Sequence, residues 1–229
     1  MQIIFDKEIK EALVLDKEKI AKDVYLDIED EENYSELSRM IDEAYEVALP
    51  KACVTKLKVR LGEENQVYLN DVLFTSKVLV KNINESVDTY GVVCTCGVEI
   101  EKWAQGYRDD PLLNYYADAI MVEVLGAAVV FTSTYLSSLS EYSISHASPG
   151  STADLPLSNQ EKLFEAIGNV KEKTGVFLTP EFLMKPLKSV SGIYFANDSD
   201  YTDCKLCTKV NCPRRREPYD DSMFKEFYS

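Results

Sequence analysis

Three cysteines near the C-terminus have the spacing of metal ligands. Cys204, Cys207 and Cys212 follow the pattern C-x₂-C-x₄-C. Two thiolates at the C-x₂-C spacing converge on one ion when they lie on a turn, so the pattern predicts a zinc or iron–sulfur site. Three thiolates leave such a four-coordinate site one ligand short. The missing ligand would be Cys53, Cys94, Cys96 or a non-protein group.

The chemistry of this site depends on what it holds. A cluster would carry electrons, zinc would brace the fold, and free thiols remain a third alternative. Cys94 and Cys96 point to the same side of a predicted strand, which makes them a second candidate pair or simply two small core residues. The neighbouring cations favour thiolates and suit an acidic partner; they are Lys205, Lys209 and Arg214–Arg216.

A second stretch of interest is KPLKSVSGIYF at residues 185–195, where small residues precede an aromatic pair. An ordinary core strand carries bulky β-branched residues at the positions of Ser189, Ser191 and Gly192. Small side chains let another group approach the backbone closely. The stretch therefore predicts a contact surface that ends at Tyr194.

A third stretch, ISHASPGSTADLPL at residues 144–157, is a predicted loop rich in Gly, Pro and Ser. Such loops carry function when a rigid scaffold presents them, and they also serve as plain connectors. The loop contains His146, the only histidine of the chain, followed by Ser148, Pro149 and Gly150.

The elements around these stretches predict an α+β fold. Strands are expected over 53–61, 66–74, 87–100 and 176–179. Helices are expected from Asn33 to Pro50, from Ser76, from Pro111 to Leu136, from a capping box at Ser158 to Gly175, and at Thr179-Pro180. The helix at 111–136 is apolar on more than one side, so we expect it to be the central buried one. Residues 1–200 are expected to form the domain and residues 201–229 a basic Cys-rich tail.

Composition excludes some classes of function. The 229 residues carry a formal net charge of −14, which argues against nucleic-acid binding, because a phosphate backbone is held by surplus Lys and Arg. The N-terminal residues lack the pattern of a signal peptide, and the apolar run at Ile120–Phe131 is too short to span a bilayer. We therefore expect a cytoplasmic protein without a membrane partner.

In order along the chain, these segments resemble the reactivation (S-adenosylmethionine-binding) domain of cobalamin-dependent methionine synthase, in a stand-alone form. The most specific match is GVFLTPEFLMKPLKSVSGIYF at residues 175–195, which ends in Ser-Val-Ser-Gly-x-Tyr-Phe. Supporting matches are CTCGVEIE, YYADAI, and SPG followed by LPLSNQEKLFEAI. The resemblance covers most of the chain.

The resemblance implies a curved, mostly antiparallel sheet flanked by helices. It also implies S-adenosylmethionine in a shallow groove, with Tyr194 near the ligand and with Ser189, Ser191 and Gly192 allowing close backbone contact. The residues His146, Ser148, Pro149 and Gly150 would form the substrate loop. The domain would present the methyl donor to a cobalamin on a partner, and an electron-donor protein would reduce the cobalt.

The chain departs from the family in that loop. The family's loop runs Arg-x-x-Pro-Gly-Tyr, with the arginine pairing with the ligand's carboxylate, whereas this chain has His146 and Ser151 at the two ends. Loss of a charge-assisted pair would cost about 2 kcal/mol, roughly thirtyfold in affinity. Positioning does most of the work in this chemistry, so we expect no catalytic nucleophile and no acid–base pair.

Two functions follow as hypotheses. In the first, the chain is a component of a cobalamin-dependent methyltransferase system that remethylates cobalamin on a methionine synthase or another corrinoid protein, with S-adenosylmethionine as methyl donor. In the second, it is a corrinoid-protein docking or electron-relay module that no longer binds S-adenosylmethionine and holds a metal in its Cys tail. A third interpretation keeps the fold and assigns no ligand.

Overall fold

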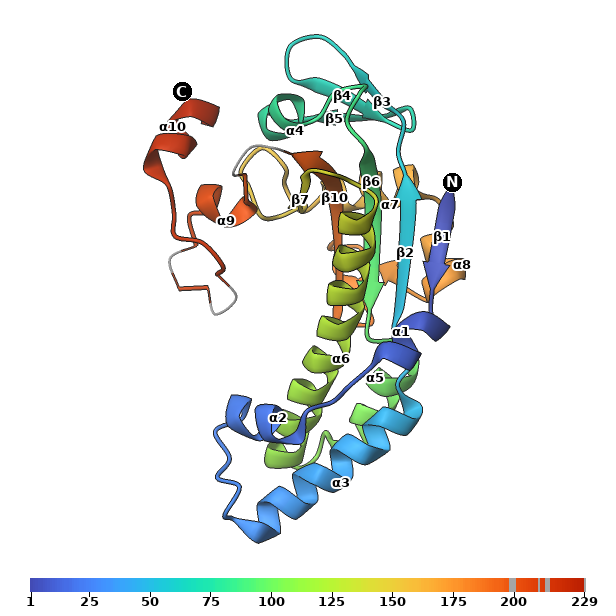
Figure 1. Cartoon of the computed structure of the whole chain (residues 1–229), viewed down its shortest axis with the longest axis vertical. Coiled ribbons are helices and arrows are strands. Elements are labelled where there is room, and N and C mark those ends of the chain that lie inside the picture. Colours follow the sequence, from blue (N-terminus) through green and yellow to red (C-terminus); the bar gives the residue numbers. More distant parts are fainter. Residues whose placement is uncertain (198–200, 210, 213–214, 229) are drawn as a thin grey trace.

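The centre of the protein is a five-stranded antiparallel sheet (Figure 1). The computed structural model describes residues 1–197, 201–209, 211–212 and 215–228. In order across the sheet, the strands are β1 (Gln2–Phe5), β2 (Lys51–Lys56), β6 (Thr89–Thr95), β10 (Ser189–Asn197) and β7 (Ser143–Ala147). All neighbouring pairs are antiparallel, so the predicted fold class, an antiparallel sheet flanked by helices, is confirmed.

Two smaller sheets accompany the main one. Strands β3 (Val59–Leu61), β4 (Gln66–Leu69) and β5 (Val72–Thr75) form an antiparallel meander at the upper end of the molecule in Figure 1. Strands β8 (Phe177–Leu178) and β9 (Met184–Lys185) form a short hairpin that leads into β10.

Helices cover both faces of the main sheet and extend past its lower end. In Figure 1, α6 runs along the front, α7 and α8 lie behind, and the helices after β10 stand beside the β7 edge. The helices are α1 (Lys7–Ala12), α2 (Lys17–Asp23), α3 (Glu31–Val47), α4 (Lys77–Asn82), α5 (Val98–Ala104), the 3₁₀ helix η1 (Gln105–Tyr107), α6 (Pro111–Ser138), α7 (Asn159–Ile167), α8 (Val170–Thr174), α9 (Asp203–Leu206) and α10 (Asp221–Tyr228).

The long helix α6 is the central helix that the apolar periodicity predicts. Its start is fixed by Pro111 in the first turn and by Asp110, whose carboxylate accepts the N–H groups of Leu112 and Leu113. By length and composition alone α6 could cross a membrane, a test that the core helix of a soluble domain also passes. Here it packs along β2 and β6 and contributes nine buried residues.

The sheet separates two apolar cores. Tyr194 on β10 belongs to the core under α6, together with Cys94 and Cys96. Ile193 and Phe195 point the other way, into the core under α7 and α8. This alternation is the two-residue period of a β-strand buried on both faces.

The segment after residue 200 packs onto the second core. Tyr201, Leu206 and Phe227 are each at most 7% exposed and belong to the same cluster as Phe195. Residues 201–229 were expected to form a Cys-rich tail, and these three side chains of that segment pack into the core that holds Phe195.

Several strands begin or end in the structure at residues other than those predicted from the sequence. The strand expected over 53–61 is broken after Lys56, because Leu57 turns into the core and Val59 begins the small sheet instead. The region 66–74 is itself a hairpin that turns at Asn70 and Asp71, both with positive φ. The strand expected over 87–100 ends at Thr95, and α5 follows. The supposed loop at 144–157 begins as β7, the edge strand of the main sheet.

The ends of several helices also differ from those predicted from the sequence. Helix α3 starts two residues before Asn33, because the carboxylate of Asp30 accepts the Asn33 N–H and caps it. Ser158 makes no side-chain capping bond, and the helix that follows breaks at Gly168 before α8 ends at Gly175. Thr179-Pro180 forms the turn between β8 and β9 rather than a helix, with the Phe182 N–H donating to the Thr179 carbonyl at 2.9 Å.

A substitution at Gly91 on β6 tests how closely the sheet packs against α7. A Cβ there would lie 2.5 Å from Cγ1 of Ile167, so Gly91→Ala should lower the free energy of unfolding by about 1–3 kcal/mol in urea titration. Gly106→Ala is the control, because a Cβ at Gly106 meets no described atom within 4 Å. Equal stability of Gly91→Ala and the wild type would contradict this packing.

Candidate functional site

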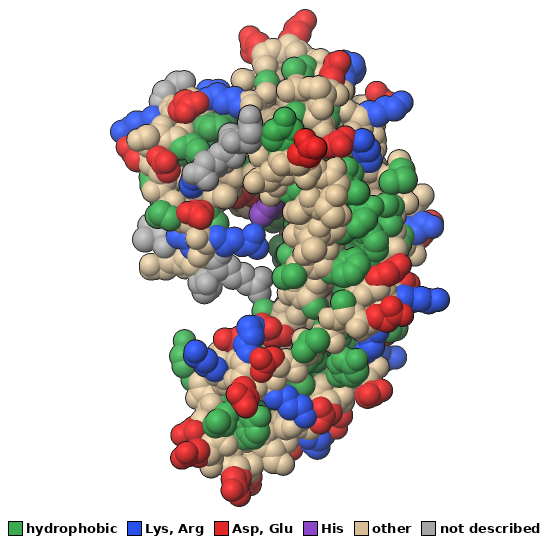
Figure 2. Space-filling model, in the orientation of Figure 1, with side chains coloured by type: hydrophobic (Ala, Val, Ile, Leu, Met, Phe, Trp, Pro, Cys, Tyr) green, Lys and Arg blue, Asp and Glu red, His purple; other side chains and the backbone are tan. Residues whose placement is uncertain are grey.

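A cleft of about 330 Å³ lies between α6 and the β7 edge of the main sheet. The space-filling view shows the histidine of the chain at the bottom of a hollow beside α6 (Figure 2). One wall is the apolar side of α6, and the opposite wall comes from β7, β10 and the C-terminal segment. The lining residues are Val122, Glu123, Leu125, Gly126, Val129, Val130, His146, Ser148, Val190, Ser191, Tyr194 and Arg216.

Two aromatic rings form the floor of the cleft. The antiparallel register of β7 and β10 places His146 directly opposite Tyr194. Their ring centroids are 5.1 Å apart and the rings are inclined by 20°, which is a stacked arrangement. Such a pair contributes about 0.5–1.5 kcal/mol beyond the buried area. The register therefore builds a flat aromatic surface from one residue of each strand.

The imidazole of His146 is held in its neutral form. Burial lowers its pKa, the carboxylate of Asp203 raises it, and the guanidinium of Arg216 lowers it further. The first effect is the largest, so His146 carries no charge at neutral pH and offers one donor and one acceptor.

Asp203 joins the C-terminal segment to the loop after β7. Its carboxylate accepts the Ser148 N–H at 2.9 Å and the Tyr201 hydroxyl at 2.6 Å, and the residue is 7% exposed. Burial raises the pKa of this carboxyl, although both hydrogen bonds and His146 oppose the rise. Losing one such partner would leave a buried polar group unpaired, at a cost of about 1–3 kcal/mol.

The hydroxyls of the serines in Ser-Val-Ser-Gly bond to neighbouring parts of the domain. The Ser189 hydroxyl bonds to Thr95 Oγ1 at 2.9 Å and to the Pro186 carbonyl at 2.8 Å. The Ser191 hydroxyl donates to Gln160 Oε1 of α7 at 3.0 Å. Both side chains project to the face opposite Tyr194. Ser189 does not line the cleft and holds the strand in place. Ser191 lines the cleft, although its hydroxyl points to α7.

Gly192 and the loop residues serve the packing of β7 on β10. A Cβ on Gly192 would lie 3.2 Å from both Ser148 Oγ and Tyr194 Cε2, so the glycine admits the loop and the ring. Gly150 adopts a φ of +89° in the turn, and its N–H donates to the Leu155 carbonyl. Pro149 and Gly150 are absent from the described lining of the cleft.

Two of the three C-terminal cysteines present their backbone carbonyls to an arginine side chain. The Arg215 guanidinium donates to the carbonyls of Cys204 at 2.7 Å, Cys207 at 2.9 Å and Lys209 at 2.7 Å. Within the described residues, no group of three or more His, Cys, Asp or Glu side chains could hold a metal ion. The predicted site at Cys204, Cys207 and Cys212 is therefore not supported. Pro213 and Arg214 lie outside the described residues.

The other cysteines are ordinary core residues. Cys53, Cys94 and Cys96 are fully buried, and burial raises the pKa of Cys94 and of Cys96 to about 12. They remain neutral thiols, which gives no support to their prediction as extra metal ligands.

Sequence reasoning missed two parts of the candidate site. The apolar residues of α6 that form a wall of the cleft were hidden in a helix that was expected to be the central buried one. Asp203 and Arg216 belong to the tail, where the cysteine spacing drew attention to metal binding. The run of arginines there was the one signal for an anionic partner.

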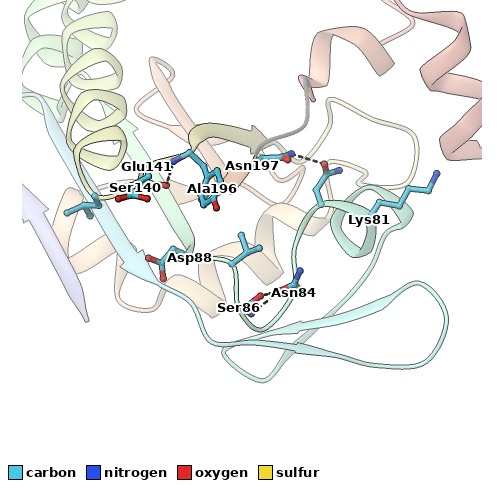
Figure 3. Close-up of a pocket in the computed structure, with 12 residues that line it drawn as sticks. Lys81, Asn84, Ser86, Asp88, Ser140, Glu141, Ala196 and Asn197 are labelled. Carbon is cyan, nitrogen blue, oxygen red and sulfur yellow. Dashed lines mark hydrogen bonds between the residues drawn. The ribbon is translucent and has the colours of Figure 1, made fainter.

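A second hollow lies at the other end of β10 (Figure 3). It has a volume of about 610 Å³ and polar walls that include Lys81, Asp88 and Glu141. Its amides bond to their neighbours: Asn197 Nδ2 donates to Asn82 Oδ1 at 2.9 Å. It lacks a stacked aromatic floor, so the α6 cleft is the better candidate site.

Thiol alkylation tests the assignment of the cysteines. With iodoacetamide and chelator-treated native protein near neutral pH, we expect modification of Cys204, Cys207 and Cys212, which are half-buried, and protection of the three core thiols. Peptide mass spectrometry reads out the sites, and urea-unfolded protein, in which all six should react, is the control. Rapid labelling of Cys94 in native protein would contradict its burial.

Comparison with known proteins relates part of the sequence and the fold to one family. Residues 136–214, which include β7, β10 and the loop between α6 and α7, match the family described as vitamin B12 dependent methionine synthase, activation domain. The fold is similar to a crystal structure of the MetH reactivation domain bound to AdoHcy, with a TM-score of 0.60 and 16% identity over 88% of this chain and 79% of that one. No curated protein matches the chain. The chain therefore has a fold similar to that of the MetH reactivation domain, and its residues 136–214 match the activation domain of vitamin B12 dependent methionine synthase.

Proposed function

We propose that the α6 cleft binds S-adenosylmethionine and that the chain serves reductive remethylation of cobalamin on a methionine synthase or another corrinoid protein. The observation that carries this proposal is the stacked pair of His146 and Tyr194, which lies inside the segment that matches the activation-domain family. The similar crystal structure contains AdoHcy, the demethylated form of the same ligand.

The chemistry of the cleft suits this ligand. An adenine ring needs a flat aromatic or apolar surface, which Tyr194, His146 and the α6 wall provide. A sulfonium is favoured by a nearby carboxylate, and Glu123 lines the same cleft, where it also pairs with Lys19. Its volume of about 330 Å³ falls in the range of small-molecule sites, roughly 300–1,000 Å³.

The residues act by positioning. The sulfonium of S-adenosylmethionine is already an activated methyl donor. A cobalamin held by the partner would supply the cobalt that accepts the methyl group once an electron-donor protein had reduced that cobalt by one electron, and S-adenosylhomocysteine would be the leaving group. Tyr194 and His146 would fix the plane of the adenosine, and Ser148 would meet its polar edge. No proton transfer to or from the chain is needed, in keeping with a neutral His146.

The partner would meet the cleft from the side of α6. Val130 lines the cleft and is 65% exposed, and Val129 beside it is partly buried. A cobalamin-binding module that approached here would cover this apolar strip while its cobalt reached the cleft. The chain's net charge of −14 favours a partner with a basic docking surface.

A second candidate function is a corrinoid-docking module that does not bind S-adenosylmethionine. The presence of neutral His146 and of Ser151 at the two ends of the loop favours it, because neither replaces a permanent cation. In that case the exposed strip of α6 would be the functional surface and the cleft would stay empty.

Titration calorimetry with S-adenosylmethionine separates the two. We expect binding by the wild type and an affinity lower by about tenfold or more in Tyr194→Ala, because the aromatic floor is lost. Tyr194→Phe, which keeps the ring, should bind like the wild type.

Tyr142→Ala is the matched control, because Tyr142 is an exposed tyrosine of the second hollow. A loss of affinity in this variant would move the site to that hollow. No heat from the wild type at millimolar ligand would exclude the methyl-donor function for the chain alone and favour the docking module.

A further inference from the structure

The C-terminal segment brings a guanidinium into the cleft. Arg216 lines the cleft beside His146, Ser148 and Tyr194, although it is 70 residues away from His146 in the chain. Its charge acts on both rings of the floor, since it lowers the pKa of His146 and opposes the rise in the pKa of Tyr194. Arg216 is therefore electrostatically part of the site.

The position of Arg216 is built by the segment that carries it. The neighbouring Arg215 donates to the carbonyls of Cys204 and Cys207, and the Arg216 N–H points to Cys204 Sγ at 3.5 Å. Asp203, next to Cys204, holds the segment to the Ser148 N–H. Arg216 thus extends from a backbone that is fixed to the loop of the cleft.

The guanidinium of Arg216 has no carboxylate partner within the described part of the chain. None of the ion pairs among those residues includes it. Asp203, whose charge also acts on His146, is satisfied by Tyr201 and Ser148. Glu123, the acidic residue of the cleft lining, pairs with Lys19. The cation at the cleft is available to an anion from outside.

We propose that Arg216 binds the carboxylate of the ligand's amino-acid part, so that the C-terminal segment completes the binding site. This inference rests on the proposed function. Arginine presents two parallel N–H groups that match a carboxylate, which neutral His146 cannot do. Arg216 of the C-terminal segment thus supplies the permanent positive charge for the carboxylate, because the stretch at residues 144–157 has the neutral His146 in place of an arginine.

The test compares two ligands in two proteins. S-adenosylmethionine and its decarboxylated analogue differ only in the carboxylate, and both are titrated calorimetrically into the wild type and into Arg216→Gln. We expect the wild type to prefer S-adenosylmethionine by about tenfold to a hundredfold, the value of a charge-assisted pair. Arg216→Gln should lose that preference while it keeps the wild-type affinity for the analogue.

Two further variants control for charge and shape. Arg60→Gln removes the same charge from exposed β3, where Arg60 lies over the Tyr68 ring, and should keep the preference. Arg216→Lys keeps the positive charge but loses the two parallel N–H groups of the guanidinium. It should retain only part of the preference for S-adenosylmethionine. Thermal unfolding of each variant shows whether the fold is intact.

The other outcomes are distinct. If Arg216→Gln discriminates between the two ligands as the wild type does, or weakens both equally, Arg216 does not bind the carboxylate and the inference is overturned while the proposed function stands. The same holds if the wild type binds both ligands equally well. If the wild type binds neither ligand, the proposed function and the inference fall together.

Discussion

The alternation of side chains along β10 is the constraint on which the other features depend. This strand pairs with β6 on one side and β7 on the other, and both of its faces are buried. Ser189, Ser191 and Phe195 belong to the α7 face, whereas Gly192 and Tyr194 belong to the α6 face. A slip of one residue would exchange the two sets, placing Tyr194 against α7 and removing the floor of the cleft. The hydrogen bonds of Ser189 and Ser191 on the far face therefore fix the orientation of the aromatic residue on the near face.

The cleft is an assembly of three chain regions, each of which supplies a different property. Helix α6 provides an apolar wall, the β7–β10 pair provides the stacked rings, and the C-terminal segment provides the cation. The buried carboxylate of Asp203 links the β7–β10 pair to the C-terminal segment, because it holds the loop after β7 to the segment that carries Arg216. Arg215 organises the turn of the cysteines through their carbonyls, so the shape of the tail does not require a metal ion. A tail that looked like a separate metal-binding appendage is thereby part of the domain and of its candidate site.

Sequence patterns were reliable where one physical rule dominated. The apolar stripe that starts at Pro111 located α6, and His146 and Tyr194, which the sequence resemblance singled out, lie opposite each other on β7 and β10. They failed where tertiary contacts decide. The capping box at Ser158 makes no capping bond, Thr179-Pro180 is a hairpin turn, and the Ser189 and Ser191 hydroxyls turn away from the cleft to bond with Thr95 and Gln160. The roles of Asp203 and Arg216 depend on how a terminal segment folds back onto the sheet, and no local pattern encodes that return.

The central claim is that the ligand lies on the Tyr194–His146 pair under α6, and a crystal structure of the chain with S-adenosylhomocysteine tests it most directly. The account predicts electron density for the adenosine in the α6 cleft, against the two stacked rings, with the carboxylate of the amino-acid part directed toward Arg216. Density in the polar hollow of Lys81 and Asp88 would contradict the account, as would an empty α6 cleft at millimolar ligand.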